Sequence, residues 1–417
     1  MIQTKSIAII GAGPSGLMAA EILAAAGHKV TVCDRMPSPG RKFLMAGRGG
    51  LNLTHSEPLD SFISRYGDAA GWLAPHIRAF TPDMLRAWCE GLGQETFVGS
   101  SGRVFPRSMK AASLLRAWLK RLEKLGVNFA ARHTWEGWEG DALQFSDAAG
   151  QKLLANPDAT LLALGGGSWS RLGSDGKWSQ ILAAAGVKLS PLRPTNCGFI
   201  VPWSDYFSTR FAGTPLKPVA LTHNGITRQG EGMITARGLE GGAVYALSAS
   251  LREAIAAQGS AVLQLDLSPS ISTEALTQKL QAPRGNKSFS TYLRRAGLSP
   301  LSVALLREVT SAEELAQATP GALAMRLKAL PITLTATTGL ARAISTAGGI
   351  ERGAVDEHFM LRARPGVFAA GEMLDWEAPT GGYLLQGCFS TAHAAAQGIL
   401  RYLAASSASQ LQLSLSL

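Results

Sequence analysis

The chain has 417 residues and a formal net charge of +10, with 46% hydrophobic and 17% charged residues. This balance is typical of a globular protein, and the length predicts two or three domains. No apolar run approaches the ~20 residues that cross a bilayer, so we expect no membrane partner. The first apolar run enters a glycine loop without a small-residue cleavage site, so it is not expected to be a signal peptide.

The cysteines are scattered along the chain, and none forms a C-x-x-C pair. This spacing predicts neither a zinc site nor a disulfide framework, so we expect no bound metal and a cytoplasmic protein with reduced thiols. The cysteine positions are Cys33, Cys89, Cys197 and Cys388.

The most informative pattern lies at the start of the chain. A four-residue apolar run ends at Ile10 and leads directly into G-x-G-x-x-G over residues 11–16. An Ala- and Leu-rich segment over 17–26 predicts a helix, and residues 29–34 predict a second strand that ends on Asp34. Strand, glycine loop, helix, strand and terminal acid are together typical of a dinucleotide-binding βαβ unit.

Each residue type in this unit has a physical role. Gly11 permits the tight turn, Gly13 lacks a Cβ and leaves room for a pyrophosphate, and Gly16 lets the helix pack close to the strand. The free N–H groups and the positive end of the helix then face the phosphates. Asp34 is placed to accept hydrogen bonds from the adenosine ribose.

Further glycine-rich stretches follow in the first half of the chain. Residues 47–55 let the backbone lie against a flat or phosphorylated ligand, and a buried strand over 160–164 runs into glycines at 165–167. Between these stretches we predict an amphipathic helix that ends at Leu125 and antiparallel strands over 127–145.

The second half changes character twice. From about residue 190 prolines separate short β-like segments, whereas residues 270–330 have a mostly helical pattern. Near the C-terminus a buried strand over 366–370 leads to Gly371-Glu372, and Thr-Gly-Gly-Tyr at 380–383 opens a last helix.

The chain thus begins and ends with a buried strand, glycines and a helix start. A dinucleotide that needs contacts from both ends of the chain is FAD rather than NAD. N–H groups at the start of the last helix are expected to face the flavin pyrimidine edge, where a positive helix end stabilises reduced flavin. A second G-x-G-x-x-G is missing, so we expect NAD(P)H to dock only transiently over the flavin.

The contacts expected with FAD are spread over the whole chain. The residues expected to bind it are Gly11, Ala12, Gly13, Pro14, Ser15, Gly16, Asp34, Arg35, Arg41, Lys42, Gly47, Asn52, Leu53, Trp135, Leu164, Gly165, Gly166, Gly371, Glu372, Gly381, Gly382, Tyr383 and Leu384.

Several of these stretches recur in the same order in a known family, whose known members include the bile-acid reductase BaiN. Over most of residues 5–400 the chain resembles this family of predicted NAD(P)/FAD-dependent oxidoreductases. The stretches that carry the resemblance are 11–16, 40–42, 47 with 52–54, 165–168, 345–350, and 370–375 with 380–383.

The resemblance implies an α/β fold: a glutathione-reductase-type FAD-binding Rossmann-like domain with an inserted β-barrel-like domain and a small helical insertion. We expect the FAD-binding domain over 1–190 and 348–404 and the β-rich domain over 191–268 and 331–347. The helical insertion is expected over 269–330, and the low-complexity tail over 405–417 is expected to be disordered.

The family usually reads Gly-Arg-Cys-Asn-Leu-Thr-Asn at its second glycine loop, whereas residues 49–55 here read Gly-Gly-Leu-Asn-Leu-Thr-His. The cysteine is absent, so thiol chemistry inferred for relatives does not carry over. No C-x4-C pair follows Asp34 either, so a dithiol–disulfide mechanism is not expected.

Candidate catalytic groups are few. Asn52 and His55 follow the second glycine loop, and Tyr383 follows the last one. His55 has a pKa naturally near neutrality, although a lone loop histidine is also commonly structural. Arg48 is placed to hold an anionic substrate or a phosphate.

Two functions are compatible with these patterns. The first is an FAD-dependent oxidoreductase that transfers a hydride or two electrons between flavin and a small organic substrate, with NAD(P)H as a transient donor. The alternative is a flavin-containing, RNA-associated protein with a basic binding surface, which only the excess of basic residues supports. No nucleic-acid-binding motif accompanies these residues, so we expect no stable nucleic-acid partner. Many of the basic residues have a simpler explanation, because Arg116, Lys120, Arg121 and Lys124 are spaced like the solvated face of a helix.

Overall fold

The computed structural model describes residues 4–46 and 49–415, with side chains up to residue 406. The chain forms two compact units, one of residues 1–193 with 345–417 and one of residues 194–344. The chain therefore leaves the first unit once and returns to it once. These limits lie three residues from the expected domain limits at 190 and 348.

The first unit is built on a parallel five-stranded sheet in the order β20-β10-β1-β2-β6. All four residues of β10 and the last four of β1 are buried, because helices cover both faces of a parallel sheet. The strands are β1 (Ser6–Ile10), β2 (Lys29–Asp34), β6 (Asn128–Ala131), β10 (Ala159–Leu162) and β20 (Val367–Ala369).

The strand order reverses at β1. From β1 the chain continues to β2 and β6 on one side, whereas β10 lies on the other side, with Ile9 paired to both Val32 and Leu161. Loops leave the carboxyl ends of β1 and β10 in opposite directions at such a point, and a crevice opens between them. The topology therefore places a ligand site beside the glycine loop.

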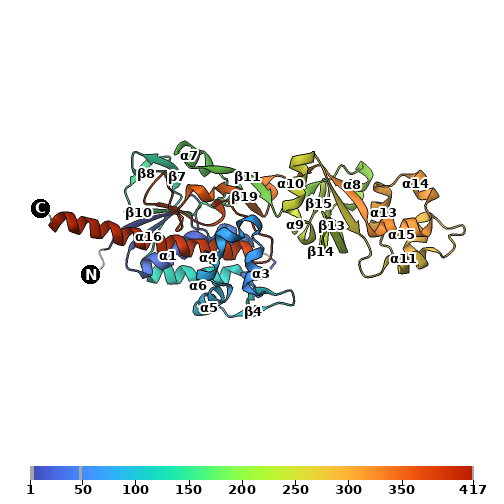
Figure 1. Ribbon diagram of the computed structural model, residues 1–417, viewed down its shortest axis with the longest axis horizontal. Coiled ribbons are helices and arrows are strands. Elements are labelled where there is room, and N and C mark those ends of the chain that lie inside the picture. Colours follow the sequence, from blue (N-terminus) through green and yellow to red (C-terminus); the bar gives the residue numbers. More distant parts are fainter. Residues whose placement is uncertain (1–3, 47–48, 416–417) are drawn as a thin grey trace. The chain divides into compact units, whose positions relative to one another are not determined.

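Helix α16 runs through the core of this unit and packs against α1 and α4 (Figure 1). We expected disorder from residue 405, but α16 continues as a helix to Leu415. The Ala, Ser, Gln and Leu residues of this stretch only have to extend a helix that is already nucleated. The helices are α1 (Pro14–Ala25), α2 (Arg41–Ala46), α3 (Leu59–Ser64), α4 (Ala70–Ala79), α5 (Pro82–Gly91), α6 (Ala111–Lys124), α7 (Trp178–Ala184) and α16 (Tyr383–Leu415).

The amphipathic pattern of α6 is confirmed, because Leu115, Trp118 and Leu122 are buried while Arg116 and Lys120 are exposed. The expected antiparallel strands are confirmed for β7 and β8, but β6 instead joins the parallel sheet beside β2. The smaller sheets are β3 (Thr54–His55), β5 (Arg103–Pro106) and β4 (Thr96–Val98); β7 (Thr134–Glu139), β8 (Ala142–Ser146) and β9 (Lys152–Ala155); and β11 (Leu189–Thr195) with β19 (Ser345–Ile350).

The second unit carries a seven-stranded antiparallel sheet. The strands at the two ends of the sheet order are β17 and β18, and only Thr335 separates them in the sequence. This short segment therefore pairs with β16 through β17 and with β12 through β18. The strands are β12 (Phe199–Ile200), β13 (Pro215–His223), β14 (Ile226–Thr235), β15 (Gly238–Glu240), β16 (Ala261–Asp266), β17 (Leu330–Leu334) and β18 (Ala336–Thr337).

Five helices fill most of the stretch expected to be helical. Their buried leucines, such as Leu276 and Leu305, belong to the same hydrophobic cluster as Leu263 and Ile332 of the strands. The expected helical and β-rich insertions therefore share one core. The helices of this unit are α8 (Asp205–Phe211), α9 (Gly242–Tyr245), α10 (Ser248–Gln258), α11 (Thr273–Leu280), α12 (Phe289–Arg295), α13 (Pro300–Glu308), α14 (Ala312–Gln317) and α15 (Pro320–Lys328).

Candidate functional site

The three glycines of the loop after β1 are needed for two different reasons, close packing and open space. Gly11 has φ +109°, and a Cβ there would lie 2.2 Å from the carbonyl oxygen of Ala163. A Cβ on Gly16 would lie 1.9 Å from the carbonyl oxygen of Gly11. A Cβ on Gly13 would meet nothing within 4 Å. The first two glycines are therefore required by packing, whereas Gly13 keeps space open in front of α1.

Asp34 is held against this loop by two backbone hydrogen bonds. The N–H groups of Ala12 and Met36 donate to its two carboxylate oxygens, both at 2.7 Å. Burial raises the pKa of the Asp34 carboxyl, and the hydrogen bond from Ala12 acts in the opposite direction. The carboxylate is thus fixed at the end of β2, next to the loop, as the sequence pattern predicts.

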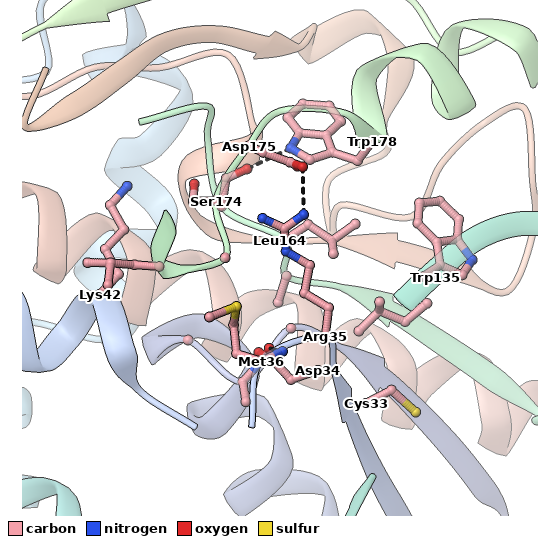
Figure 2. A pocket seen from close by; sticks show the side chains of 18 of the residues that line it. Cys33, Asp34, Arg35, Met36, Lys42, Trp135, Leu164, Ser174, Asp175 and Trp178 are labelled. Carbon is pink, nitrogen blue, oxygen red and sulfur yellow. Dashed lines mark hydrogen bonds and ion pairs between the residues drawn. The ribbon is translucent and has the colours of Figure 1, made fainter. Parts of the chain in front are cut away.

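These elements enclose a pocket of about 430 Å³ (Figure 2). Most of the residues expected to bind FAD line it, although they come from six separate segments. Those that line it are Gly11, Ala12, Gly13, Pro14, Ser15, Asp34, Arg35, Arg41, Lys42, Trp135, Leu164, Gly165 and Glu372.

Arg35 connects two walls of this pocket. One guanidinium nitrogen donates to Asp175 at 2.6 Å and the other to the carbonyl oxygen of Ser170 at 3.0 Å (Figure 2). Asp175 was not among the expected site residues, although it lies shortly before α7. Ser174 in turn donates to the carbonyl oxygen of Gly166 at 2.9 Å.

Three buried donor atoms among the lining residues have no hydrogen-bonding partner in the part of the chain that the structure describes. They are Nε of Arg35, Nε of Arg41 and Nε1 of Trp135. All three are N–H groups, so they suit a ligand rich in acceptor oxygens and ring nitrogens. Together with the open space at Gly13, these donors fit the adenosine and pyrophosphate of FAD.

A second group of contacts surrounds Glu372. Lys42 Nζ lies 2.6 Å from its Oε2, and the N–H groups of Gly166 and Thr346 donate to the carboxylate at 3.3 and 3.0 Å. Thr346 Oγ1 also accepts from the N–H of Gly167 at 2.9 Å. Thr346 was missing from the expected site residues, although it lies in a stretch that carried the family resemblance.

The expected residues around the last helix do not line this pocket. Gly382 has φ +94° and packs against β3, where a Cβ would lie 2.5 Å from Cα of Thr54. Gly371 packs against Ser15, with a Cβ position 2.3 Å from its Oγ. The other expected residues outside the pocket lining are Gly16, Asn52, Leu53, Gly166, Gly381, Tyr383 and Leu384. Gly47 and Arg48 lie outside the described residues.

Tyr383, the first residue of α16, begins a short chain of polar contacts. Its hydroxyl donates to Glu57 at 2.6 Å, and Glu57 forms an ion pair with Arg65 at 2.6 Å. Burial, followed by the hydrogen bond to Glu57, raises the pKa of the Tyr383 hydroxyl. The hydrogen bond from Arg65 lowers the pKa of Glu57. Tyr383 therefore holds its proton beside a carboxylate that stays ionised.

His55 stacks on Tyr383, with ring centroids 5.4 Å apart. Its Nδ1 accepts from the N–H of Glu57 at 3.1 Å, and its Nε2 lies 2.9 Å from the carbonyl oxygen of Ser101. Both ring nitrogens of His55 are thus engaged by the protein itself. This arrangement favours a structural role for His55 over the catalytic role considered from the sequence.

Asn52 lies close to this cluster in sequence, two residues before Thr54. Its Oδ1 is buried and has no hydrogen-bonding partner in the described chain, and the same holds for Oγ1 of Thr54. Two buried polar oxygens are therefore left without a partner in the described chain, and one of them belongs to Thr54, which packs against Gly382.

The cysteines do not supply reactive thiols. All four are free and buried. Burial raises the pKa of Cys33 to about 11 and that of Cys388 to about 12, so the thiols near the pocket stay protonated. In the described ranges no three His, Cys, Asp or Glu side chains lie together as metal ligands would. No helix in the same ranges is long and apolar enough to span a membrane.

Two relatives align over nearly their whole length. The 3-dehydro-bile acid delta(4,6)-reductase of Clostridium scindens is 27% identical and the alignment covers 93% of this chain and 97% of that protein. The ribosomal RNA dihydrouridine synthase of Escherichia coli is 25% identical, with 94% and 97% covered.

Two solved structures share the fold at 12% identity and a TM-score of 0.52. One is the open conformation of a flavocytochrome c3 fumarate reductase, for which the alignment covers 96% of this chain and 79% of the other chain. The other is the 3-ketosteroid delta1-dehydrogenase of Sterolibacterium denitrificans, with 95% and 99% covered. The family model described as HI0933-like protein Rossmann domain matches residues 5–398. The chain therefore belongs to the HI0933-like family, and the protein is a flavin oxidoreductase.

Proposed function

We propose that the protein is an FAD-dependent reductase that takes two electrons from NAD(P)H and adds them to a carbon–carbon double bond conjugated with a carbonyl group. The observation that carries the FAD assignment is the pocket in front of α1, where Gly13 keeps space open and three buried N–H donors have no partner in the described chain. We further propose the glutathione-reductase-type arrangement of the FAD domain and a barrel-like closure of the second unit's sheet.

Different residues of the pocket would contact different parts of the cofactor. Asp34 would hold the ribose, the N–H groups around Gly13 would hold the pyrophosphate, and Trp135 would lie by the adenine. Glu372, with its ion-paired Lys42, would lie further along the cofactor. The start of α16 at Tyr383 would then lie near the flavin, as expected for the glycines at 381 and 382.

The substrate class rests on the names of the two relatives. A delta(4,6)-reductase of 3-dehydro-bile acids and a synthase of dihydrouridine both saturate a C=C bond that is conjugated with a carbonyl group. Such a bond accepts a hydride at one carbon and a proton at the other. The flavin, when bound, supplies the hydride and is restored by NAD(P)H, which leaves as NAD(P)⁺.

The chain must supply the proton, and Tyr383 is the best-placed source. Its Oη carries a firmly held proton, and the neighbouring Glu57 connects it to the exposed side of Arg65. When Tyr383 gives its proton to the substrate, a proton that arrives from solvent past Arg65 and Glu57 would replace it. The ion pair with Arg65 keeps Glu57 ionised, so that its carboxylate accepts a hydrogen bond from the hydroxyl of Tyr383 and orients it.

The visible spectrum of the purified protein, followed by anaerobic titration with NADH and with NADPH, tests the cofactor assignment. Oxidised flavin absorbance that bleaches with one of them is expected. Reoxidation is then measured with a conjugated enone, a saturated ketone and an isolated alkene as matched acceptors. Only the enone should reoxidise the flavin under nitrogen. Equal reoxidation by all three, or by none, would contradict the proposed substrate class.

A second candidate keeps the same chemistry but places the double bond in RNA. It is favoured by the ribosomal RNA dihydrouridine synthases of Escherichia coli and Haemophilus influenzae, which are 25% and 26% identical over 94% and 96% of this chain. Mass spectrometry of RNA treated with the reduced protein distinguishes the two, because saturation of a uracil ring adds two hydrogen atoms.

A further inference from the structure

Residues 275–307 of the second unit carry six basic side chains and no acidic one. Five of the six are exposed, and Lys287 is half-buried. In the part of the chain that the structure describes, none of the six forms an ion pair. Two acids, Glu274 and Glu308, border the segment, and Glu308 accepts hydrogen bonds from Ser204. The six residues, named here the α12 basic surface, are Lys279, Arg284, Lys287, Arg294, Arg295 and Arg307.

The fold gathers these residues around α12. The guanidinium carbons of Arg284 and Arg307 each lie 5.8 Å from the ring centroid of Phe289, so two positive charges flank one aromatic ring. Nε of Arg284 also donates to the carbonyl oxygen of Lys287 at 2.8 Å. The loop before α12 and the end of α13 are thereby brought to the start of α12.

The other end of α12 extends the surface. Arg294 and Arg295 are its last two residues, and a seven-residue helix is about 10 Å long. The hydroxyl of Tyr292 donates to the carbonyl oxygen of Leu280, which brings Lys279 next to the same helix. The positive charges therefore occupy both ends of α12 and the segments packed beside it.

We propose that the α12 basic surface binds RNA through its phosphates. Six cations that are distributed over both ends of α12 match the successive phosphates of a nucleic-acid strand better than they match a single phosphate group. Four of the six are arginines, whose forked guanidinium group binds phosphate oxygens in pairs. A membrane surface fits less well, because none of the large exposed hydrophobic side chains lies within 275–307 to enter a bilayer. The proposal deepens the RNA alternative of the proposed function, but it does not depend on the reductase chemistry.

The test compares two charge-neutralised variants of the full-length protein. Arg294→Gln with Arg295→Gln removes two charges from the α12 basic surface without touching the Phe289 contacts. Arg116→Gln with Lys120→Gln removes two exposed charges from α6 and serves as the matched control. Circular dichroism, thermal unfolding and flavin content verify that all three proteins are folded alike.

Binding of a fluorescein-labelled single-stranded RNA is measured by anisotropy across a salt series. We expect the wild type and the α6 control to bind alike, and the α12 variant to bind about tenfold more weakly at low salt with a slope of log K against log salt reduced by about 1–2. Equal binding by all three proteins, equal loss in both variants, or binding only to vesicles that contain phosphatidylserine would overturn the proposal. Flavin bleaching is measured in parallel, so failure of the reductase assignment is distinguished from failure of this one.

Discussion

The ammonium group of Lys42 lies 2.6 Å from Oε2 of Glu372, although 330 positions separate the two residues in the chain. The side chain of Glu372 is only 6% exposed and that of Lys42 is 25% exposed. This ion pair connects α2 to the turn after β20. It therefore holds together the N-terminal and C-terminal parts of the proposed cofactor site.

Replacement of this lysine should destabilise the fold. In Lys42→Met the buried carboxylate of Glu372 keeps only backbone N–H donors, and we expect the free energy of unfolding to fall by about 2–3 kcal/mol. Lys152→Met removes a lysine from an exposed ion pair with Glu139 and should change the free energy by less than about 1 kcal/mol. Urea unfolding of both variants measures the difference; equal effects would contradict a stabilising role for the buried pair.

Gly13→Val should abolish FAD binding while the protein stays folded. The backbone of Gly13 has φ −83° and ψ −176°, which valine adopts readily, and no protein atom would lie within 4 Å of its Cβ. The side chain would instead fill the space proposed for the pyrophosphate. Flavin absorbance of the purified variant, together with its thermal unfolding, gives the result.

The matched glycine variant is Gly16→Ala, in which the added Cβ would lie 1.9 Å from a backbone carbonyl oxygen. It should lower the unfolding temperature or prevent soluble expression. A Gly13→Val protein with stoichiometric flavin would show that the phosphates do not lie at this loop.

Tyr383→Phe should separate the two halves of the proposed reaction. FAD content and anaerobic bleaching by NAD(P)H should persist, whereas reduction of the conjugated enone should slow by about 10²–10⁴-fold, because a positioned proton donor contributes about that much. The solvent isotope effect and the pH profile of reoxidation should change as well. Tyr402→Phe, which removes another tyrosine hydroxyl of the same unit, is the control; if both variants slow reoxidation alike, Tyr383 is not the donor.

His76 should make the protein less stable in mild acid. Burial, followed by the charge of His358, lowers the pKa of His76 from 6.5 to about 4. Because the folded-state pKa is the lower one, the unfolded chain binds the proton first, and stability is lost as the pH falls from about 6.5 toward 4. The ring also packs on Phe359, with centroids 4.5 Å apart.

Between pH 7 and pH 5 this loss should be on the order of 1 kcal/mol, after allowance for the partial exposure of the ring. Urea midpoints of the wild type and of His76→Phe at the two pH values measure it. The variant should lose less stability on acidification than the wild type does. An identical loss in both would assign the acid sensitivity to other groups.

The βαβ unit at the N-terminus could be predicted because its determinants are local. Within about thirty residues the sequence contains a buried strand, glycines at fixed spacing, a helix that begins at Pro14 and an acid that ends the next strand. Likewise, the helical spacing of apolar residues such as Trp118 and of basic residues such as Lys120 was enough to assign the two faces of α6. Such patterns follow from the periods of helix and strand and need no knowledge of distant partners.

Other features depend on partners that are distant in sequence. The short segment that became β6 was assigned to an antiparallel pair, because the residues of a strand do not specify which neighbour it will join. The close approach of Gly382 to the backbone of Thr54 could not be predicted, because the two residues are far apart in the sequence. Asp175 carries no local signature of a site, and Thr346 received no role although its stretch carries the family resemblance. The fold brings Asp175 to Arg35 and Thr346 to the glycines after β10.

The sequence by itself therefore determined the family, the α/β class and the position of the phosphate-binding loop, since these depend on short-range spacing of residue types. Only the tertiary structure decided that Lys42 meets Glu372, that Tyr383 donates to Glu57, and that the basic residues of 275–307 surround a single helix. These relationships arise from sheet order and helix packing, which are set by the burial of apolar surface over the whole chain and not by any one segment of it.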